Sequence, residues 1–428
     1  MKVYTYRDKA CRVFLESMRN RSASLTTTLL PTVEDIISQV RKGGDRALRQ
    51  LTKKFDGHTR ISVPVREIRT AYRKISPELH AALHEARQRI IAFHQQQLHT
   101  SWLRTGPYHE VFGQIVRPLE RVGIYVPGGK AVYPSSVLMN ALPARVAGVQ
   151  EIVMVTPGTA RGIDAAILAA ADMCGIERVY QIGGAQAVAA LAYGTQTVPR
   201  VDKIVGPGNI YVALAKKLVY GDVAIDMIAG PSEILIVNDG SGDPDWAAAD
   251  LLSQAEHDEM ASAVLITTSV VFARKVKAAL ARRIAMLPRS DIARASLARY
   301  GGIIVVRTIE IALQLANELA PEHLELFVHN PWEMLPFITN AGAVFLGHMT
   351  PEAIGDYIAG PNHVLPTGGT ARFSSPLTVD DFLKKTSVIA CTFDALATLG
   401  PAAEIIARSE ALDAHAASVS VRLHAPRR

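Results

Sequence analysis

The stretch that decides the fold runs from Glu151 to Gly194 and reads EIVMVTPGTARGIDAAILAAADMCGIERVYQIGGAQAVAALAYG. Two short runs rich in β-branched residues, 152–155 and 178–182, are each followed by a longer, alanine-rich segment. Strand runs that alternate with helical segments are the signature of a parallel sheet with crossover helices. The stretch therefore predicts strands over 152–155 and 178–182, and helices over 164–174 and 185–193.

The same alternation continues on both sides of this stretch. Upstream, 111–117 and 122–126 are β-type runs, whereas residues 1–60 are expected to be helical. Downstream we expect a strand over 203–205, a helix over 209–219, and then a second set of units: strands over 234–237, 263–267, 302–306, 324–328 and 343–346, with helices over 245–257, 271–286 and 309–319. The fold class is therefore α/β with two lobes, and no sequence repeat relates them.

The chain of 428 residues is longer than one hydrophobic core usually serves. The predicted division has a helical N-terminal arm, two lobes and a tail, and the tail has too few apolar residues to fold alone. We expect the tail, a strand over 387–391 followed by helices, to pack on another lobe or another subunit. The boundaries are 1–24 for the arm, 25–120 and 233–374 for the first lobe, 121–232 for the second lobe, and 375–428 for the tail.

Composition excludes several classes of protein. The formal charge of +6 is modest and scattered, which disfavours nucleic-acid binding. The three cysteines lie far apart without paired spacing, which fits a reducing cytoplasm and no disulfide framework. The first residues lack the apolar core of a signal peptide, and the uncharged segment 179–199 carries glutamine, glycine and proline, so it predicts buried core rather than a membrane helix. We expect a cytoplasmic protein with no membrane partner.

Four glycine-containing loops lie beside the expected strands: 125–129, 183–187, 206–211 and 230–233. Loops at the carboxyl ends of parallel strands bind ligands in α/β proteins, and glycine lets the backbone approach a phosphate. None of the four completes the dinucleotide fingerprint or a P-loop, and each alone is more simply a tight turn. Four together favour a ligand that carries phosphate.

A polar constellation begins at the end of the helix expected over 245–257, in the first lobe. Gln254 and His257 are three positions apart, so they share one helical face and could hold a cation such as zinc. Alone, the pair is more simply a helix end that faces water. Carboxylates and imidazoles downstream change this, because Glu322-His323 and Asp356 supply the residue types that a metal site or a general base needs.

The chain resembles the histidinol dehydrogenase family in five motifs. They are ERVGIYVPGG (120–129), SQAEHD (253–258), PEHL (321–324), GPNHVLPT (360–367) and SPLTVDDF (375–382). The resemblance covers nearly the whole chain, in order and at family length. It implies an incomplete Rossmann-like nucleotide-binding fold and an intertwined homodimer, in which the tail of one subunit completes the site of the other.

The resemblance also implies an activity and a set of site residues. The activity is the zinc-dependent, NAD-linked oxidation of L-histidinol to L-histidine through L-histidinaldehyde, in two hydride transfers. Zinc would be held by Gln254, His257, Asp356 and His415, and protons would be transferred by Glu322 and His323. The substrate would contact Ser232, His323, Asp356 and Glu410 beside the metal ligands. NAD would contact Tyr125, Gln186 and Asn209.

Two features depart from this pattern. The family usually has glycine after the residue that corresponds to Glu410, and this chain has Ala411. Glu410 and His415 are also five positions apart, about 140° around a continuous helix, so both face one site only if the helix begins or bends between them.

Three rival functions stay open at this point. A family relative could oxidise another small polar alcohol, although the presence of both Glu410 and His415 argues against it. A zinc hydrolase could use Glu322 as the base for metal-bound water, but it would leave the glycine loops without a purpose. A non-enzymatic basic binding protein is disfavoured by the scattered charge.

Overall fold

The computed structural model describes residues 1–19, 23–128, 132–228 and 230–424. The chain forms two compact units: Met1–Gln97 with Glu120–Phe382, and Leu98–Leu119 with Leu383–Arg428. Among the described residues, none of the helices has both the length and the apolar character needed to cross a membrane. Gly129, which ends the first glycine loop, and 425–428 of the predicted tail lie outside the described residues.

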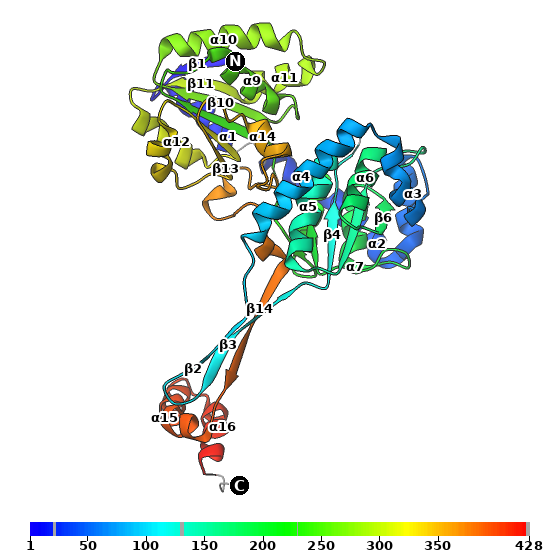
Figure 1. The fold of residues 1–428 in the computed structure, drawn as a ribbon, viewed down its shortest axis with the longest axis vertical. Coiled ribbons are helices and arrows are strands. Elements are labelled where there is room, and N and C mark those ends of the chain that lie inside the picture. Colours follow the sequence, from blue (N-terminus) through cyan, green and yellow to red (C-terminus); the bar gives the residue numbers. More distant parts are fainter. Residues whose placement is uncertain (20–22, 129–131, 229, 425–428) are drawn as a thin grey trace. The chain divides into compact units, whose positions relative to one another are not determined.

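The first unit contains a five-stranded sheet in which every pair is parallel, in the order β6-β5-β4-β7-β8 (Figure 1). Its strands are β4 (Arg121–Tyr125), β5 (Glu151–Thr156), β6 (Arg178–Gln181), β7 (Lys203–Val205) and β8 (Ala224–Ile225), and its crossover helices are α5 (Pro134–Ala147), α6 (Ala165–Met173), α7 (Gly184–Tyr193) and α8 (Ile210–Val219). The predicted alternation is confirmed here. Because the chain leaves β4 towards β5 and β6 and returns to β7, the strand order reverses between β4 and β7.

A second parallel sheet has six strands in the order β1-β11-β10-β9-β12-β13. Its strands are β1 (Lys2–Thr5), β9 (Glu233–Asn238), β10 (Ser262–Thr267), β11 (Gly301–Val305), β12 (His323–Phe327) and β13 (Ala343–Leu346). The helices of this part are α9 (Pro244–Ala255), α10 (Val270–Ile284), α11 (Ser290–Tyr300), α12 (Ile309–Leu319), α13 (Pro331–Met334) with η2 (Leu335–Phe337), and α14 (Glu352–Tyr357). The central strands β9 and β10 are buried along their whole length, which explains their near-continuous apolar sequence.

The N-terminal segment differs from its prediction. Residues 1–60 were expected to be helical, but β1 is a strand at the edge of the six-stranded sheet. The helices that follow are α1 (Lys9–Arg19), α2 (Ala23–Asp56), α3 (Val65–Thr70), η1 (Ala71–Lys74) and α4 (Pro77–Gln95). Helix α2 is kinked at Gly44, whose φ of 52° is left-handed. Apolar residues of α2, including Val33 and Val40, share a core with the five-stranded sheet, so this helix does not belong with the six-stranded lobe as the predicted boundaries had it.

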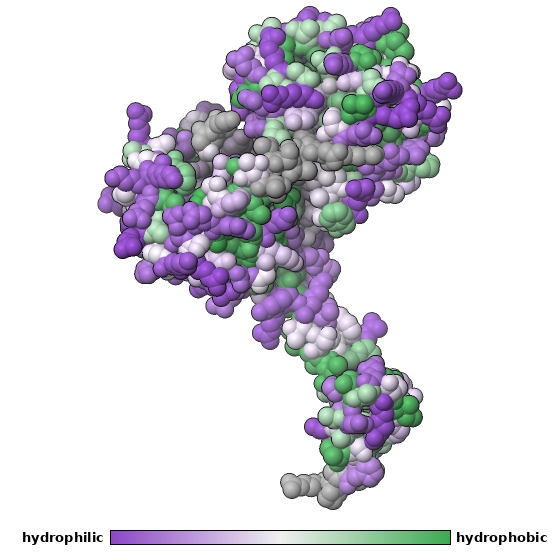
Figure 2. Space-filling view, turned by 180° about the vertical axis from the view of Figure 1, so that it is seen from behind, coloured by the Kyte–Doolittle hydropathy of each residue, from purple (hydrophilic) through white to green (hydrophobic). Residues whose placement is uncertain are grey.

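The second unit is a three-stranded antiparallel sheet with two helices. Strands β2 (Trp102–Thr105), β3 (Val111–Pro118) and β14 (Leu383–Ala390) pair in the order β14-β3-β2, and α15 (Phe393–Ser409) and α16 (Asp413–Leu423) follow. The unit therefore joins the end of the chain to a hairpin from its first third. Figure 2 shows apolar side chains at the surface of this unit, and Ile389 and Ile405 are 77% and 70% exposed.

Candidate active site

Most of the predicted catalytic and metal residues lie at the amino edge of the six-stranded sheet. Strands β9 and β12 are parallel neighbours, and they begin at Glu233 and His323. Helix α9 runs back against the strands, so its C-terminal residues, including Gln254, return to the same edge before β10 begins. Gln254, Glu322 and His323 are all buried.

His323 is the centre of this cluster. Its Nδ1 lies 2.9 Å from the carbonyl oxygen of Glu233, and because a carbonyl only accepts, Nδ1 carries a proton. Its Nε2 lies 3.5 Å from Oδ1 of Asp356 and 4.0 Å from Oε1 of Glu352, and it makes no hydrogen bond within the described part of the chain. Burial lowers the pKa of His323, but the charges of Glu322, Asp356 and Glu352 outweigh burial and raise the pKa to about 10.

Glu322 lies beside His323, with its Oε2 3.7 Å from Nδ1 of the ring. The same Oε2 accepts a hydrogen bond of 2.8 Å from the backbone N–H of Glu233. Burial raises the pKa of Glu322 to about 8, against the opposing charge of His323. The residue can therefore exchange a proton near neutral pH, as a general base must.

Three of the four predicted metal ligands lie around His323. Nε2 of Gln254 lies 3.3 Å from Nδ1 of His323, a contact that is not a hydrogen bond because both atoms carry protons, and Oε1 of Gln254 is buried without a hydrogen-bond partner in the described residues. Burial lowers the pKa of His257. The nearby charge of Asp356 raises this pKa, and that of His323 lowers it. A buried carboxamide oxygen without a partner is the kind of atom that a cation would satisfy, so Gln254, His257 and Asp356 suit a metal ion.

The cluster contains a carboxylate that the sequence analysis missed. One ligand-type atom each from His323, Glu352 and Asp356 lie within 4.8 Å of one another. Burial raises the pKa of Glu352 to about 7, whereas His323 and its neighbours hold the pKa of Asp356 below its usual range against the effect of burial. Glu352 and Asp356 are four positions apart on α14, and this spacing is the signal that could have identified Glu352 from the sequence.

Two further acids lie behind this cluster. Burial raises the pKa of Glu325 well above its usual value and raises the pKa of Asp250 to about 6, and the two carboxyls interact. Oε1 of Glu325 accepts the backbone N–H of Glu352 at 2.9 Å, and Ser253 donates to Oε2 of Glu352 at 2.7 Å. Ser253 thus binds Oε2 of Glu352, whereas Oε1 is the oxygen that approaches His323.

The remaining predicted substrate residues belong to two places. Ser232 directly precedes β9, and its carbonyl oxygen accepts the N–H of Ser262 at the start of β10. Glu410 and His415 belong to the second compact unit, where both are exposed. Helix α15 ends before Glu410 and α16 begins at Asp413, so the two residues do not lie on one continuous helix. Ala411 at this break has a φ of 58°, a conformation that glycine adopts more easily.

Of the three predicted NAD residues, Tyr125 is the last residue of β4, and Gln186 and Asn209 follow the carboxyl ends of β6 and β7. The hydroxyl oxygen of Tyr125 accepts the N–H of Gly184 at 3.0 Å, and burial raises the pKa of Tyr125 to about 12. Gln186 is buried, and its Nε2 lacks a partner among the described residues. Asn209 is exposed and caps α8. These residues flank the point at which the strand order reverses, where α/β sheets bind ligands.

The loops after β4 and β7 approach each other so closely that one position requires glycine. Gly206 has a φ of 111°, and a Cβ atom there would lie 2.2 Å from the carbonyl oxygen of Tyr125. Its N–H donates to Asp226 at 2.8 Å, and Asp226 forms a buried ion pair with Lys216. Lys216 in turn donates to the carbonyl of Gly206 at 2.9 Å, which fixes the backbone of this loop.

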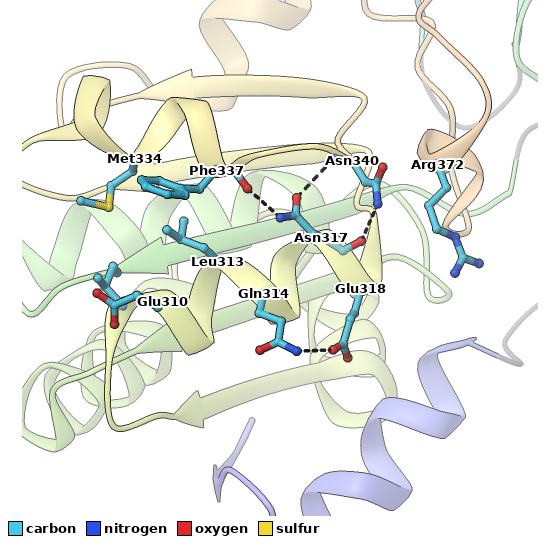
Figure 3. Close-up of a pocket in the computed structure, with 10 residues that line it drawn as sticks. Glu310, Leu313, Gln314, Asn317, Glu318, Met334, Phe337, Asn340 and Arg372 are labelled. Carbon is cyan, nitrogen blue, oxygen red and sulfur yellow. Dashed lines mark hydrogen bonds between the residues drawn. The ribbon is translucent and has the colours of Figure 1, made fainter.

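A surface pocket of about 590 Å³ lies elsewhere, beside α12 (Figure 3). Leu313 and Phe337 form part of its wall, and its polar side chains bond to one another or to nearby backbone. Asn317 donates to the carbonyl of Phe337 at 2.7 Å, and Gln314 donates to Glu318 at 3.2 Å. The pocket contains none of the predicted site residues.

Comparison with known proteins identifies one family. The sequence model of the histidinol dehydrogenase family matches residues 19–423. The histidinol dehydrogenase of Syntrophotalea carbinolica is 57% identical over 396 residues, which cover 92% of each chain, and that of Geobacter sulfurreducens is 58% identical over 396 residues, which cover 91% of this chain and 92% of the relative. A crystal structure of histidinol dehydrogenase from Elizabethkingia anophelis matches with a TM-score of 0.93 and 37% identity, over 99% of this chain and 98% of that chain.

Proposed function

The chain belongs to the histidinol dehydrogenase family, and we propose that it catalyses the zinc-dependent, NAD-linked oxidation of L-histidinol to L-histidine through L-histidinaldehyde. Membership makes it an oxidoreductase of histidine biosynthesis. The observation that carries the finer proposal is the buried group around His323, in which Glu322, Gln254 and Asp356 approach one imidazole.

Zinc is proposed to be held by Gln254, His257 and Asp356, with His415 as the fourth ligand. The unpartnered Oε1 of Gln254 and the mixed nitrogen and oxygen donors support this set. When bound, zinc would supply a positive charge that anchors and polarises a small polar substrate. A cation shared with Asp356 would also offset the negative charge around His323, which would lower the pKa of that imidazole towards the working range of a base.

NAD is proposed to bind at the carboxyl edge of the five-stranded sheet, in contact with Tyr125, Gln186 and Asn209. The reversal of strand order there and the close approach of Gly206 to Tyr125 support this location. The protein orients the cofactor, and the cofactor accepts the electrons. Each turnover needs two NAD, because alcohol to aldehyde and aldehyde to acid are each two-electron oxidations.

Proton removal in the two oxidations is proposed to be divided between two residues. In the first oxidation, His323 would take the proton of the alcohol hydroxyl. In the second, Glu322 would take a proton from the water that adds to the aldehyde, and the carboxyl group that forms would lose the remaining proton as it ionises. His323 has its Nδ1 committed to Glu233, which leaves Nε2 as the nitrogen available for the substrate. Ser232 is proposed as a further substrate contact.

The second compact unit is proposed to complete the site of a partner subunit in an intertwined homodimer. Glu410 would then contact the substrate and His415 the metal across the interface. The exposed apolar side chains of this unit support the proposal, because patches of this kind usually mark interaction surfaces. The break between α15 and α16 also frees Glu410 and His415 from the geometry of one helix.

The test is to add L-histidinol and NAD to the purified protein and follow the absorbance of NADH, with and without a chelator. We expect two NADH per histidinol and loss of this activity after metal removal. Formation of NADH from other polar alcohols but not from histidinol would contradict the proposed substrate. Ester or amide hydrolysis without any use of NAD would instead support the hydrolase alternative.

A further inference from the structure

Glu233 contacts both proposed proton-transfer residues through its main chain. Its N–H donates to the carboxylate of Glu322 at 2.8 Å, and its carbonyl oxygen accepts from Nδ1 of His323 at 2.9 Å. The first bond sets the direction of the Glu322 carboxylate. The second sets the tautomer and the plane of the imidazole. One peptide segment at the start of β9 therefore orients both groups.

The side chain of Glu233 extends this arrangement in two directions. Its Oε2 accepts the backbone N–H of Glu322 at 3.3 Å, so Glu233 and Glu322 bind each other's main chain reciprocally. Its Oε1 accepts the N–H of Gly368 at 3.2 Å. The loop that contains Gly368 also holds the segment before β9, since Thr367 accepts the N–H of Gly230 at 2.5 Å.

A carboxylate suits this position better than an amide does. Two backbone N–H groups approach two different oxygens, and Glu233 is only 9% exposed, so water does not readily replace either acceptor. A glutamine would keep one acceptor and would direct its own N–H₂ group at the other backbone N–H. The chain therefore has a chemical reason for placing an acid beside Glu322, even though the two like charges repel.

We propose that Glu233 is a positioning residue for the oxidation: it acts through Glu322 and His323 by holding the start of β12 and the loop at Gly368 against the start of β9. This inference rests on the proposed function, because it assigns Glu233 a role towards the groups that move protons. Its side chain does not touch the reacting atoms. The effect of removing it should therefore depend on the presence of Glu322.

The experiment uses the full-length enzyme with its metal and compares Glu233→Gln with Glu233→Asp, which keeps two oxygens on a shorter stem. Each half-reaction is measured separately, with histidinol or histidinal supplied. For Glu233→Gln we expect kcat to fall about tenfold to 100-fold, most of all in the histidinal step, with little change in the KM for NAD. Glu233→Asp should recover part of this loss. The metal content of both variants should equal that of the parent.

A matched control lies at the other end of the same strand pair. Asp239 follows β9, and its carboxylate accepts the N–H of His329, which follows β12, at 3.0 Å. Asp239→Asn removes a comparable link between β9 and β12 without approaching Glu322. We expect this variant to keep the parent's kcat in both half-reactions.

A double-mutant cycle decides between positioning and general damage. If Glu233 acts through Glu322, adding Glu233→Gln to a Glu322→Gln variant should lower the rate of histidinal oxidation little further. The inference is wrong if the two losses multiply, or if Glu233→Gln oxidises histidinal at the parent rate. If Glu233→Gln does not fold, the same cycle with Glu233→Asp gives the same decision. Failure of the parent itself to form NADH from histidinol would instead overturn the proposed function.

Discussion

Asn209 offers the sharpest test of the proposed cofactor site, because the structure assigns it a second role. Its Oδ1 accepts the N–H of Tyr211 at 3.1 Å and the N–H of Val212 at 3.2 Å, so it is the N-cap of α8. A simple deletion such as Asn209→Ala would remove this cap together with any contact to NAD. Loss of an N-cap costs about 1 kcal/mol of stability, so an effect on NAD binding could be mistaken for a disturbed helix.

Asn209→Ser separates the two roles. Serine caps helices about as well as asparagine, so the free energy of unfolding should stay within a few tenths of 1 kcal/mol of the parent, whereas Asn209→Ala should lose about 1 kcal/mol. Neither variant keeps the carboxamide. Loss of one hydrogen bond of about 0.5–1.5 kcal/mol should raise the KM for NAD about two- to tenfold in both.

The measurements are urea unfolding and the separate KM values for NAD and histidinol. We expect the KM for histidinol to stay near that of the parent, because Asn209 follows β7 and not the strands that carry His323. A serine variant with the parent's KM for NAD would show that Asn209 only caps α8. An equal rise in both KM values would show that the loop, and not one contact, has been disturbed.

Three further predictions test the rest of the site. His257→Asn should lose bound metal and activity while its circular dichroism stays that of the parent; full metal content with normal turnover would remove His257 from the ligand set. Mixing an inactive His415 variant with an inactive His323 variant should restore part of the activity on subunit exchange, and a fully active monomer in solution would contradict the proposed tail exchange. Glu322→Gln should slow histidinal oxidation, and His323→Asn should slow histidinol oxidation, each by a factor on the order of 10²–10⁴; parent-rate histidinal oxidation by Glu322→Gln would refute this division of roles.

The parallel strands could be predicted because their burial leaves a direct mark on the sequence. Strands buried on both faces are continuous apolar runs, and β9 and β10 have that character throughout. Strand β1 could not be found in this way. It is a short edge strand, mostly exposed, and it owes its existence to pairing with β11, which lies far away in the sequence. The pairing of β14 with β3 is equally non-local.

The site could be predicted where a residue type itself signals chemistry. Glutamine and histidine at a helix end, or adjacent glutamate and histidine, are informative side chains, and the resemblance to one family gave them roles. Glu233 carries no such signal. Its main chain orients Glu322 and His323 through atoms that every residue has, and its carboxylate accepts backbone N–H groups, so the pairing of β9 with β12 is needed to identify it. The spacing of Glu410 and His415 already required a helix break if both residues were to face one site, and the structure has this break at Ala411, between α15 and α16.

The proposed NAD site lies at the carboxyl edge of one sheet and the proposed metal site at the amino edge of the other. The polarity of the helices at these edges gives a physical reason for this difference. Helices α7 and α8 begin at the carboxyl edge of the five-stranded sheet, so their N-termini present positive partial charge, which suits the phosphates of a dinucleotide. Helix α9 ends at the amino edge of the six-stranded sheet, and its C-terminus presents negative partial charge beside Gln254, which suits a cation. The chain leaves the carboxyl edge of one sheet at Ile225 and enters the amino edge of the other at Glu233. One protein thereby presents helix N-termini to an anionic cofactor at one sheet and a helix C-terminus to a metal ion at the other.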